Sequence, residues 1–292
     1  MRLDLALART FPDFSRSRLQ AWMKAGRIVV ADQPADPRGR AWGGEDVVLD
    51  ATPEPGEGDH QAEDIGLSIV YEDDHILVID KPAGLVVHPG SGIAHGTLLN
   101  ALLHHAPTLD AVPRAGIVHR LDKDTSGLLV VARTLAAQTD LVRQLQARSV
   151  RRQYLALVLG RVLQNGTVDA PIGRHPTQRV KMAVVQGARE ARTHYVVREH
   201  LPASTLVECS LDTGRTHQIR VHMASIGHPL VGDGTYNRRR SGDQRLDAFP
   251  RQALHAWRLG LIHPARRIGM EWESLLPADY SALLERLRGG TP

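Results

Sequence analysis

A run of charged residues between two apolar segments is the first feature of this sequence that could do chemistry. The stretch GIVHRLDKDTSGLLVVA covers residues 116–132 and places Arg120, Asp122, Lys123 and Asp124 within five positions. Because both flanks lead toward a core, this concentration of charge needs a physical reason. A solvated turn, a metal-binding loop, a helix cap, or a carboxylate held in a cleft to act on a substrate would each provide one.

The metal-binding alternative fails at the end of the loop. The hexapeptide DKDTSG, residues 122–127, matches the first half of a calcium-binding loop, with Gly127 at the sixth position. The twelfth position of such a loop is a bidentate Glu, whereas Arg133 stands there and would repel the ion. The sequence also lacks a His-Glu-x-x-His pair, a dinucleotide or Walker loop and a serine-hydrolase elbow. We therefore expect neither a metal nor a cofactor.

Asp122 differs from the other charges in the run. Composition alone favours a turn for DKDTSG, but Leu121 and the Val and Leu flanks draw Asp122 inward. A lone carboxylate in such a place would take up a proton, and it stays ionised only with a cation within about 4–6 Å. Arg120 is close along the chain, and Arg215 or Arg220 could reach the carboxylate in the folded protein.

Local patterns predict the elements that must position these residues. Alternation over residues 67–87 predicts a β-hairpin that turns at its three consecutive acids. Helical spacing predicts helices at residues 97–107 and 134–150, the second capped by Thr134, and residues 151–162 return to a strand. This mixture of hairpins and scattered helices favours an α+β fold over a regular βαβ series.

One further helix is expected to follow a glycine turn in TGRTHQIRVHMASIGHPLVGD, residues 213–233. Its apolar stripe is predicted to consist of Ile219, Met223 and Ile226, and Gly227 is predicted to end it.

Five blocks of sequence, in order, resemble the RNA pseudouridine synthase family, which isomerises uridines in ribosomal and transfer RNA. Together they cover most of residues 67–277. The blocks are DKPAGLVVHPG (80–90), HRLDKDTSGL (119–128), RRQYLALV (151–158), TGRTHQIRVHMASIGHPLVGD (213–233) and ALHAWRLGLIHP (253–264). The resemblance implies a catalytic domain with a mixed, mostly antiparallel sheet, flanking helices and a central cleft.

The resemblance also implies catalytic roles for three residues. Asp122 matches the essential aspartate of the family, Arg220 the arginine that pairs with it, and Tyr154 the active-site tyrosine. The reaction detaches uracil from its ribose, turns the base and rejoins it through carbon. A carboxylate could attack the ribose or the base covalently, or remove a sugar proton so that the base leaves. Both possibilities stay open.

Four further residues are expected to contact or support the substrate. Arg120 matches a family residue that helps hold the target nucleotide or fill the gap that it leaves, and Arg215 is placed for a phosphate. His119 and Lys81 are expected to assist from behind these residues.

The chain is predicted to have three sections. Residues 1–50 resemble a small ribosomal-protein-like (alpha-L) α/β RNA-binding module, residues 51–66 form an acidic linker rich in Pro and Gly, and residues 67–288 form the catalytic domain. Residues 1–30 contain six Lys and Arg residues but two acidic ones, and cations suit a phosphate backbone. The predicted RNA contacts of the module are Arg2, Arg16, Arg18, Lys24 and Arg27.

Charge and resemblance together predict the partner. Residues 75–292 carry 28 Lys and Arg residues against 17 Asp and Glu residues, a balance that favours nucleic acid. The resemblance implies a stem-loop of large-subunit (23S) ribosomal RNA, free or in an assembling subunit, from which the uridine flips into the cleft. The alternatives are uridines in other ribosomal or transfer RNA and a non-catalytic RNA-binding assembly factor. With one cysteine and no apolar leader or membrane span, we expect a soluble, cytoplasmic monomer.

Overall fold

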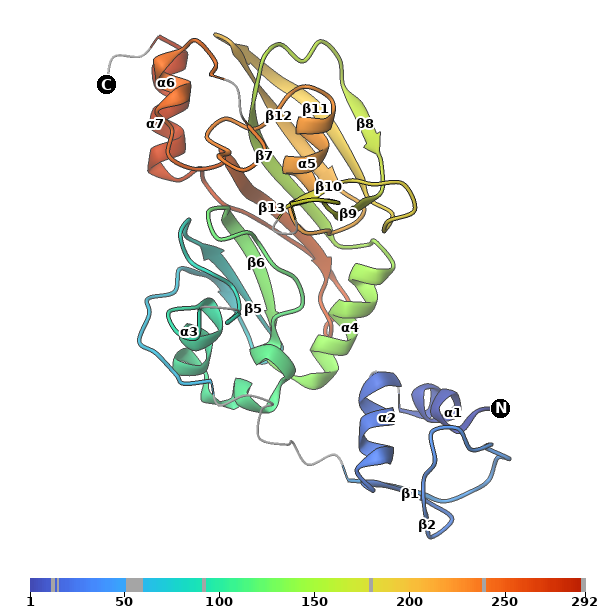
Figure 1. The fold of residues 1–292 in the computed structure, drawn as a ribbon. Helices are drawn as coiled ribbons and strands as arrows, with labels where there is room; N and C mark the ends of the chain where they lie inside the picture. Colours follow the sequence, from blue (N-terminus) through green and yellow to red (C-terminus); the bar gives the residue numbers. More distant parts are fainter. Residues whose placement is uncertain are drawn as a thin grey trace.

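The structure of the chain is a computed structural model, shown in Figure 1. It describes residues 1–11, 14, 16–50, 60–90, 93–178, 181–237 and 240–289. Residues 51–59 of the predicted linker therefore lie outside the described residues. No helix that the structure describes is both long and apolar enough to span a lipid bilayer.

One large sheet organises the second part of the chain (Figure 1). Within the described residues it has nine strands in the order β4-β5-β6-β13-β7-β12-β11-β8, with β14 also paired to β13. Its pairs are antiparallel except for β6 and β13, which are parallel. The strands are β4 (Ile69–Glu72), β5 (Ile76–Lys81), β6 (Ser126–Ala132), β7 (Arg151–Leu159), β8 (Gly166–Asp169), β11 (Arg192–Leu201), β12 (Ser204–Leu211), β13 (Leu254–Ile262) and β14 (Gly269–Glu273).

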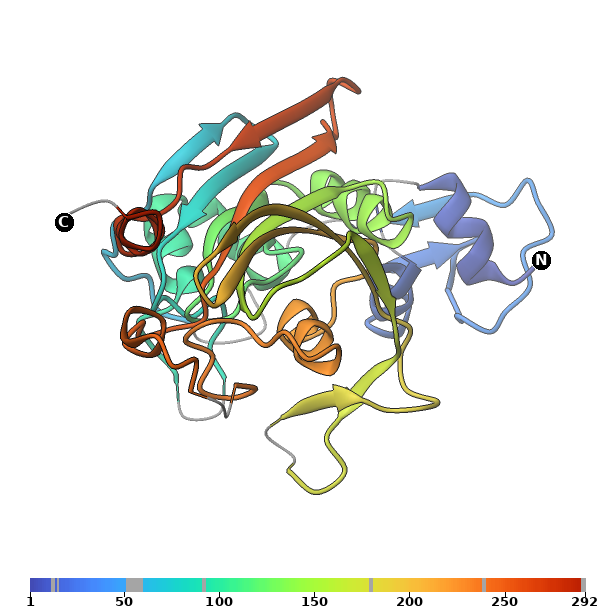
Figure 2. The ribbon, with the colours of Figure 1, turned by 90° about the horizontal axis from the view of Figure 1, so that it is seen from above.

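Helices cover this sheet, and the short strands β9 (Ile172–Arg174) and β10 (Met182–Val184) form a separate hairpin. Figure 2 shows α5 lying against the curved strands of the sheet. The predicted mixed, mostly antiparallel architecture with flanking helices is confirmed. The helices are α3 (Leu98–His105), α4 (Leu135–Gln146), α5 (Gln218–Ser225), α6 (Gln244–Asp247) and α7 (Ala278–Leu287), with 3-10 turns at Pro107–Ala111 and Pro113–Gly116.

Local signals placed several of these elements correctly. Thr97 caps α3 because its side chain accepts the Asn100 N–H. The Asn100 side chain in turn accepts the Thr97 N–H, which completes a capping box. The predicted cap Thr134 accepts the Ala137 N–H at 3.1 Å. The hairpin at 67–87 is present as β4 and β5.

The stripe predicted for α5 is wrong at its last member. Ile219 and Met223 are buried in the main core, but Ile226 is 38% exposed. The helix ends at Ser225, and Gly227, at φ +87°, turns the chain away before a third buried position is reached.

Strand β6 anchors the charged run in the fold. All seven of its residues are buried, so the segment before it is fixed at the rim of the core. Gly127 has φ +109°, and a side chain there would collide with the backbone of Ala256 on β13. The close parallel pairing of β6 with β13 thus requires this glycine and fixes where Asp122 can lie.

The N-terminal residues form a small structure with a core of its own. It contains α1 (Leu3–Thr10), α2 (Arg16–Lys24) and a three-stranded sheet in the order β2-β1-β3. The strands are β1 (Ile28–Val30), β2 (Gln33–Pro34) and β3 (Val47–Leu49). The buried residues include Leu7, Leu19, Trp22 and Ile28.

Candidate active site

Asp122 lies in the loop before β6, on the wall of a cleft. Its side chain is 16% exposed, and its Oδ2 lies 3.0 Å from Nη1 of Arg220. Arg120, Arg215, His119 and Tyr154 line the same cleft as these two residues. The fold therefore brings together six of the seven predicted residues of the catalytic domain, from segments far apart in the sequence.

Arg220 is held from behind by a second carboxylate. Its Nε and Nη2 donate to Asp233 at 2.7 and 2.9 Å, while Nη1 remains for Asp122. Burial alone would lower the pKa of Arg220, but the two carboxylates outweigh burial and raise that pKa above its usual range. The guanidinium is therefore a permanent, fixed positive charge beside Asp122.

Asp233 was not anticipated from the sequence. Its side chain is completely buried, and its Oδ1 also accepts the N–H groups of Thr235 and Tyr236. The available signal was its place at the end of the block 213–233, directly after Gly232. An acid after a glycine is usually a turn residue, which is why the pattern did not single it out.

His217 faces the other oxygen of Asp122. Its Nε2 lies 3.9 Å from Oδ1 of Asp122, and its Nδ1 lies 2.8 Å from the hydroxyl of Tyr236. That hydroxyl accepts the N–H of Met182 at 3.0 Å, so it can donate its own proton to Nδ1 and leave the Nε2 proton directed at Asp122. Burial lowers the pKa of His217. His217 also has φ +55°, a strained conformation that is common at functional sites.

Tyr154 presents its ring to the cleft from the middle of the sheet. It lies on β7 opposite Cys209 of β12 and Ala256 of β13, and it is 6% exposed. Burial raises the pKa of its phenol, Arg152 opposes the shift and the charge of Asp122 adds to it. The hydroxyl therefore keeps its proton, and the ring offers an uncharged surface on which a base can stack.

Comparison with known proteins decides the family. Residues 75–225 match the family described as RNA pseudouridylate synthase. The ribosomal large subunit pseudouridine synthase D of Nitrosomonas europaea is 59% identical over 291 residues, which are 99% of this chain and 85% of that protein. The protein of the same name from Pseudomonas aeruginosa is 56% identical over 98% of this chain and 92% of its own length.

The chain belongs to the RNA pseudouridine synthase family. Among solved structures, human RNA pseudouridylate synthase domain containing 1 has a TM-score of 0.57 at 31% identity, over 78% of this chain and 97% of its own. Human RNA pseudouridylate synthase domain containing 4 has a TM-score of 0.58 at 28% identity, over 76% of this chain and 93% of its own. The predicted family, fold and enzyme class are confirmed.

Lys81 of this synthase lies behind the cleft and does not line it. Its side chain is fully buried, and Nζ donates to the carbonyls of Pro82, Leu85 and Lys123 at 2.8 to 2.9 Å. Burial lowers its pKa to about 8, although Asp124 and then Asp122 oppose the shift. This geometry gives Lys81 a supporting place behind the cleft, because the three protons of its ammonium connect the segment after β5 to the loop that carries Asp122.

The other predicted substrate residues lie where they could act. Arg120 is exposed on the cleft wall. Arg215 is half-buried and donates from Nε to Glu190 O, which leaves its Nη atoms available. His119 is a neutral support, since its Nε2 accepts the N–H of Val130 at 3.1 Å.

Two of the predicted RNA contacts of the N-terminal module also stabilise the module itself. Arg2 and Arg16 both bind the fully buried Asp4, and Gln20 joins them. Both side chains remain about half exposed, at 52% and 44%, so each can still reach a phosphate.

Two of the remaining predicted contacts lie beside Trp22. Arg18 and Arg27 lie 5.6 and 5.2 Å from the centre of its ring, within cation–π distance. Lys24 is exposed.

Within the described parts of the chain, no group of three His, Cys, Asp or Glu side chains is placed to hold a metal ion.

The Asp233 carboxylate is predicted to be a main support of the synthase's stability. Asp233→Ala leaves the buried Arg220 cation with one carboxylate instead of two. Because loss of one partner from a buried ion pair costs about 3–5 kcal/mol, we expect the free energy of unfolding in urea to fall by about 3 kcal/mol. Glu199→Ala, which removes a surface ion pair with Arg288, should cost less than about 1 kcal/mol. Similar losses in the two variants would contradict the prediction.

His119 is predicted to make the folded protein sensitive to acid. Burial, assisted by the charge of Arg152, lowers its pKa to about 3 from 6.5. Between these values the unfolded chain takes up a proton that the folded chain does not, so the free energy of unfolding falls as the pH drops from 6.5 toward 3. Urea unfolding across this range should show a shallower fall for His119→Gln, which can still accept the Val130 N–H. His200→Gln, a change at an exposed position, should behave as wild type, and an unaltered slope in His119→Gln would refute the assignment.

Proposed function

We propose that this synthase isomerises uridines of large-subunit (23S) ribosomal RNA, with Asp122 as the essential carboxylate. The observation that carries the assignment of Asp122 is its contact with Arg220, at 3.0 Å on the wall of a cleft. The RNA target is supported by the relatives, which are named as large-subunit synthases and align with 98–99% of this chain.

Asp122 acts as an ionised group in this proposal. Arg220 stabilises its negative charge, and a fixed cation of this kind needs no rearrangement during the reaction. The C1′–N1 bond of uridine breaks, the uracil turns, and a bond from C1′ to C5 replaces it. The proton lost from C5 balances the proton gained at N1. Covalent attack by Asp122 and removal of a sugar proton both require this carboxylate, charged and next to the ribose.

The remaining groups orient the nucleotide. The uridine leaves its helical stack to meet Asp122, which is easiest in a loop. The Tyr154 ring then lies against the uracil, Arg120 contacts the displaced nucleotide and Arg215 a phosphate. Mapping pseudouridine in ribosomal RNA from cells with and without the gene tests the target. Loss of one or more sites from 23S RNA is expected, and an unchanged 23S pattern would exclude it.

Asp122→Asn is expected to abolish turnover while leaving RNA affinity within about threefold of wild type. The amide keeps the shape of the side chain but removes its charge, which both chemical routes need. Pseudouridine formation on unmodified 23S RNA and filter binding of the same RNA measure the two quantities. Asp110→Asn is the matched control, since Asp110 is exposed on the same cleft and pairs with no arginine in the described part of the chain. Substantial turnover by Asp122→Asn would overturn the proposal.

We further propose that residues 1–50 form a separate RNA-binding module, joined by the linker 51–66 to the catalytic domain at 67–288. The tether raises the effective concentration of the module near the RNA.

Deletion of residues 1–50 is expected to weaken binding of ribosomal RNA about tenfold or more. Affinity should also depend less steeply on salt, because fewer phosphates are neutralised and fewer counterions released. Single-turnover rates at saturating enzyme should stay close to those of the full chain, since the catalytic residues are untouched. Equal affinity and equal salt dependence for the two proteins would rule out an RNA-binding role.

A further inference from the structure

Arg152 is a buried cation whose charge the described residues leave largely uncompensated. It lies on β7, is 8% exposed, and its buried Nε has no hydrogen-bond partner. Among the described residues it makes one hydrogen bond, a long one from Nη2 to the carbonyl of Leu211 at 3.4 Å. Arginine keeps its proton in proteins, so this is a permanent charge with most of its donors unused. Such a group is costly to bury.

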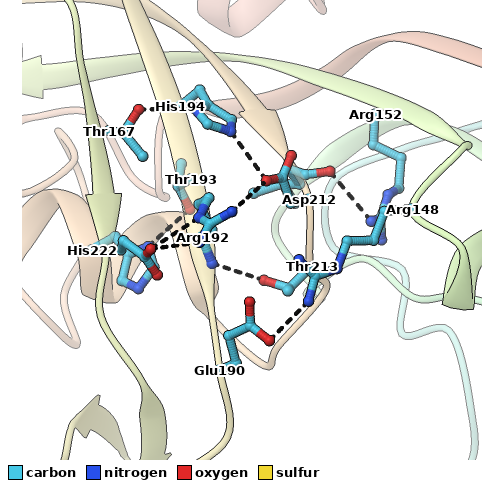
Figure 3. A network of polar contacts seen from close by, with 12 residues as sticks. Arg148, Arg152, Thr167, Glu190, Arg192, Thr193, His194, Asp212, Thr213 and His222 are labelled. Atoms are coloured by element: carbon cyan, nitrogen blue, oxygen red, sulfur yellow. Dashed lines mark hydrogen bonds and ion pairs between the residues drawn. The ribbon is translucent and has the colours of Figure 1, made fainter.

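Asp212, whose charge acts on Arg152 from a distance, already has other partners. Asp212 contacts His194 at 3.2 Å and Arg192 at 3.7 Å, in the network of Figure 3. Across the described residues, no carboxylate lies within ion-pair distance of Arg152. The described residues therefore supply no carboxylate that pairs with Arg152, and its free donors can accept a partner from outside the protein.

A partner can reach Arg152 through the cleft. Arg152 and Tyr154 are two positions apart on β7, so their side chains leave the same face of the sheet, and both line the cleft with Asp122. The backbone of the loop between β12 and α5 lies against the guanidinium. A Cβ on Gly214 would lie 2.7 Å from Nη1 of Arg152, so the glycine lets this backbone approach the guanidinium closely.

The position of Arg152 fits a phosphate better than a base. Residues two apart on a strand are separated by about 7 Å, a span that one nucleotide covers from its base to a flanking phosphate. A base on Tyr154 thus brings a phosphate near Arg152. A guanidinium also binds phosphate through two parallel hydrogen bonds, and a phosphate brings the negative charge that a uracil carbonyl lacks.

We propose that Arg152 binds an RNA backbone phosphate next to the target uridine and thereby positions the base on Tyr154 beside Asp122. Arg152 is a positioning residue, and the inference rests on the proposed function insofar as the phosphate belongs to the RNA that carries the uridine. The cleft without RNA then contains an unbalanced charge that the substrate neutralises on entry.

This proposal predicts opposite effects on stability and on binding. Arg152→Met keeps the length of the side chain and removes the charge, so the melting temperature of the RNA-free protein should stay the same or rise. Affinity for RNA should fall roughly 10- to 100-fold, the range of one charge-assisted hydrogen-bonded contact. A purely structural arginine would lower the melting temperature when replaced.

The decisive experiment pairs this variant with a modified RNA. The probe is a stem-loop around a uridine that the wild-type protein converts, made with a neutral methylphosphonate at either linkage flanking that uridine. One of the two substitutions should weaken wild-type binding by a factor similar to that of Arg152→Met, and should weaken the variant no further. Arg151→Met is the control, because Arg151 is the neighbour on the opposite face of β7, with a side chain that is 77% exposed. It should bind as wild type and respond to the methylphosphonate as wild type does.

Two results would overturn the inference: wild-type affinity in Arg152→Met, or equal losses from the methylphosphonate in wild type and variant at both linkages. Failure of the proposed function has a different signature, since wild type would then leave 23S RNA unmodified. The stem-loop is in that case taken from the RNA that wild type does convert, and the same comparison decides the role of Arg152.

Discussion

The chain of contacts from Asp122 through Arg220 to Asp233 is the interaction on which the site depends. Two carboxylates share one guanidinium, so the group carries a net charge of −1. Asp233 is fully buried and takes two of the three bonded nitrogens, which leaves Asp122 with one. The Oδ1 of Asp122 has no hydrogen bond to the described residues, and His217 is 3.9 Å from it. The arrangement therefore neutralises the structural acid and leaves the excess negative charge on the acid that faces the cleft.

This contact joins segments that only the sheet can bring together. Asp122 and Arg220 are 98 residues apart, and each is fixed by burial of its neighbours. The fully buried strand β6 and the close pairing at Gly127 fix the loop before the strand. Ile219 and Met223 fix α5 in the same core cluster as Tyr154. The core thus sets the 3.0 Å separation, which is why a rigid α+β domain suits chemistry that needs one well-placed charge.

The sequence predicted what depends on near neighbours. Local patterns predict caps such as Thr134, the hairpin at 67–87 and the burial of β6. The family resemblance then predicted all the active-site residues together. From the residues alone, the cation beside Asp122 could be narrowed to three arginines but not chosen, because the choice depends on tertiary structure. Lys81 was expected to assist from behind the substrate residues, but nothing in the sequence shows that three backbone carbonyls surround its ammonium. Arg152 was missed, although period-two alternation from Tyr154 already puts it on the face that looks into the cleft.

The buried cations of this domain differ in what satisfies them, and that difference separates their roles. Arg220 is balanced by carboxylates and Lys81 by carbonyls, so both are complete without a ligand. Arg152 is not. A buried cation without hydrogen-bond partners destabilises the RNA-free protein but not the complex with RNA. The full free energy of its interaction with a phosphate therefore contributes to binding. The general excess of positive charge over residues 75–292 attracts RNA from a distance. Arg152 is buried in the cleft, so it can bind a phosphate only after the target nucleotide has entered. It thereby adds to the affinity only for RNA in the conformation that the reaction requires.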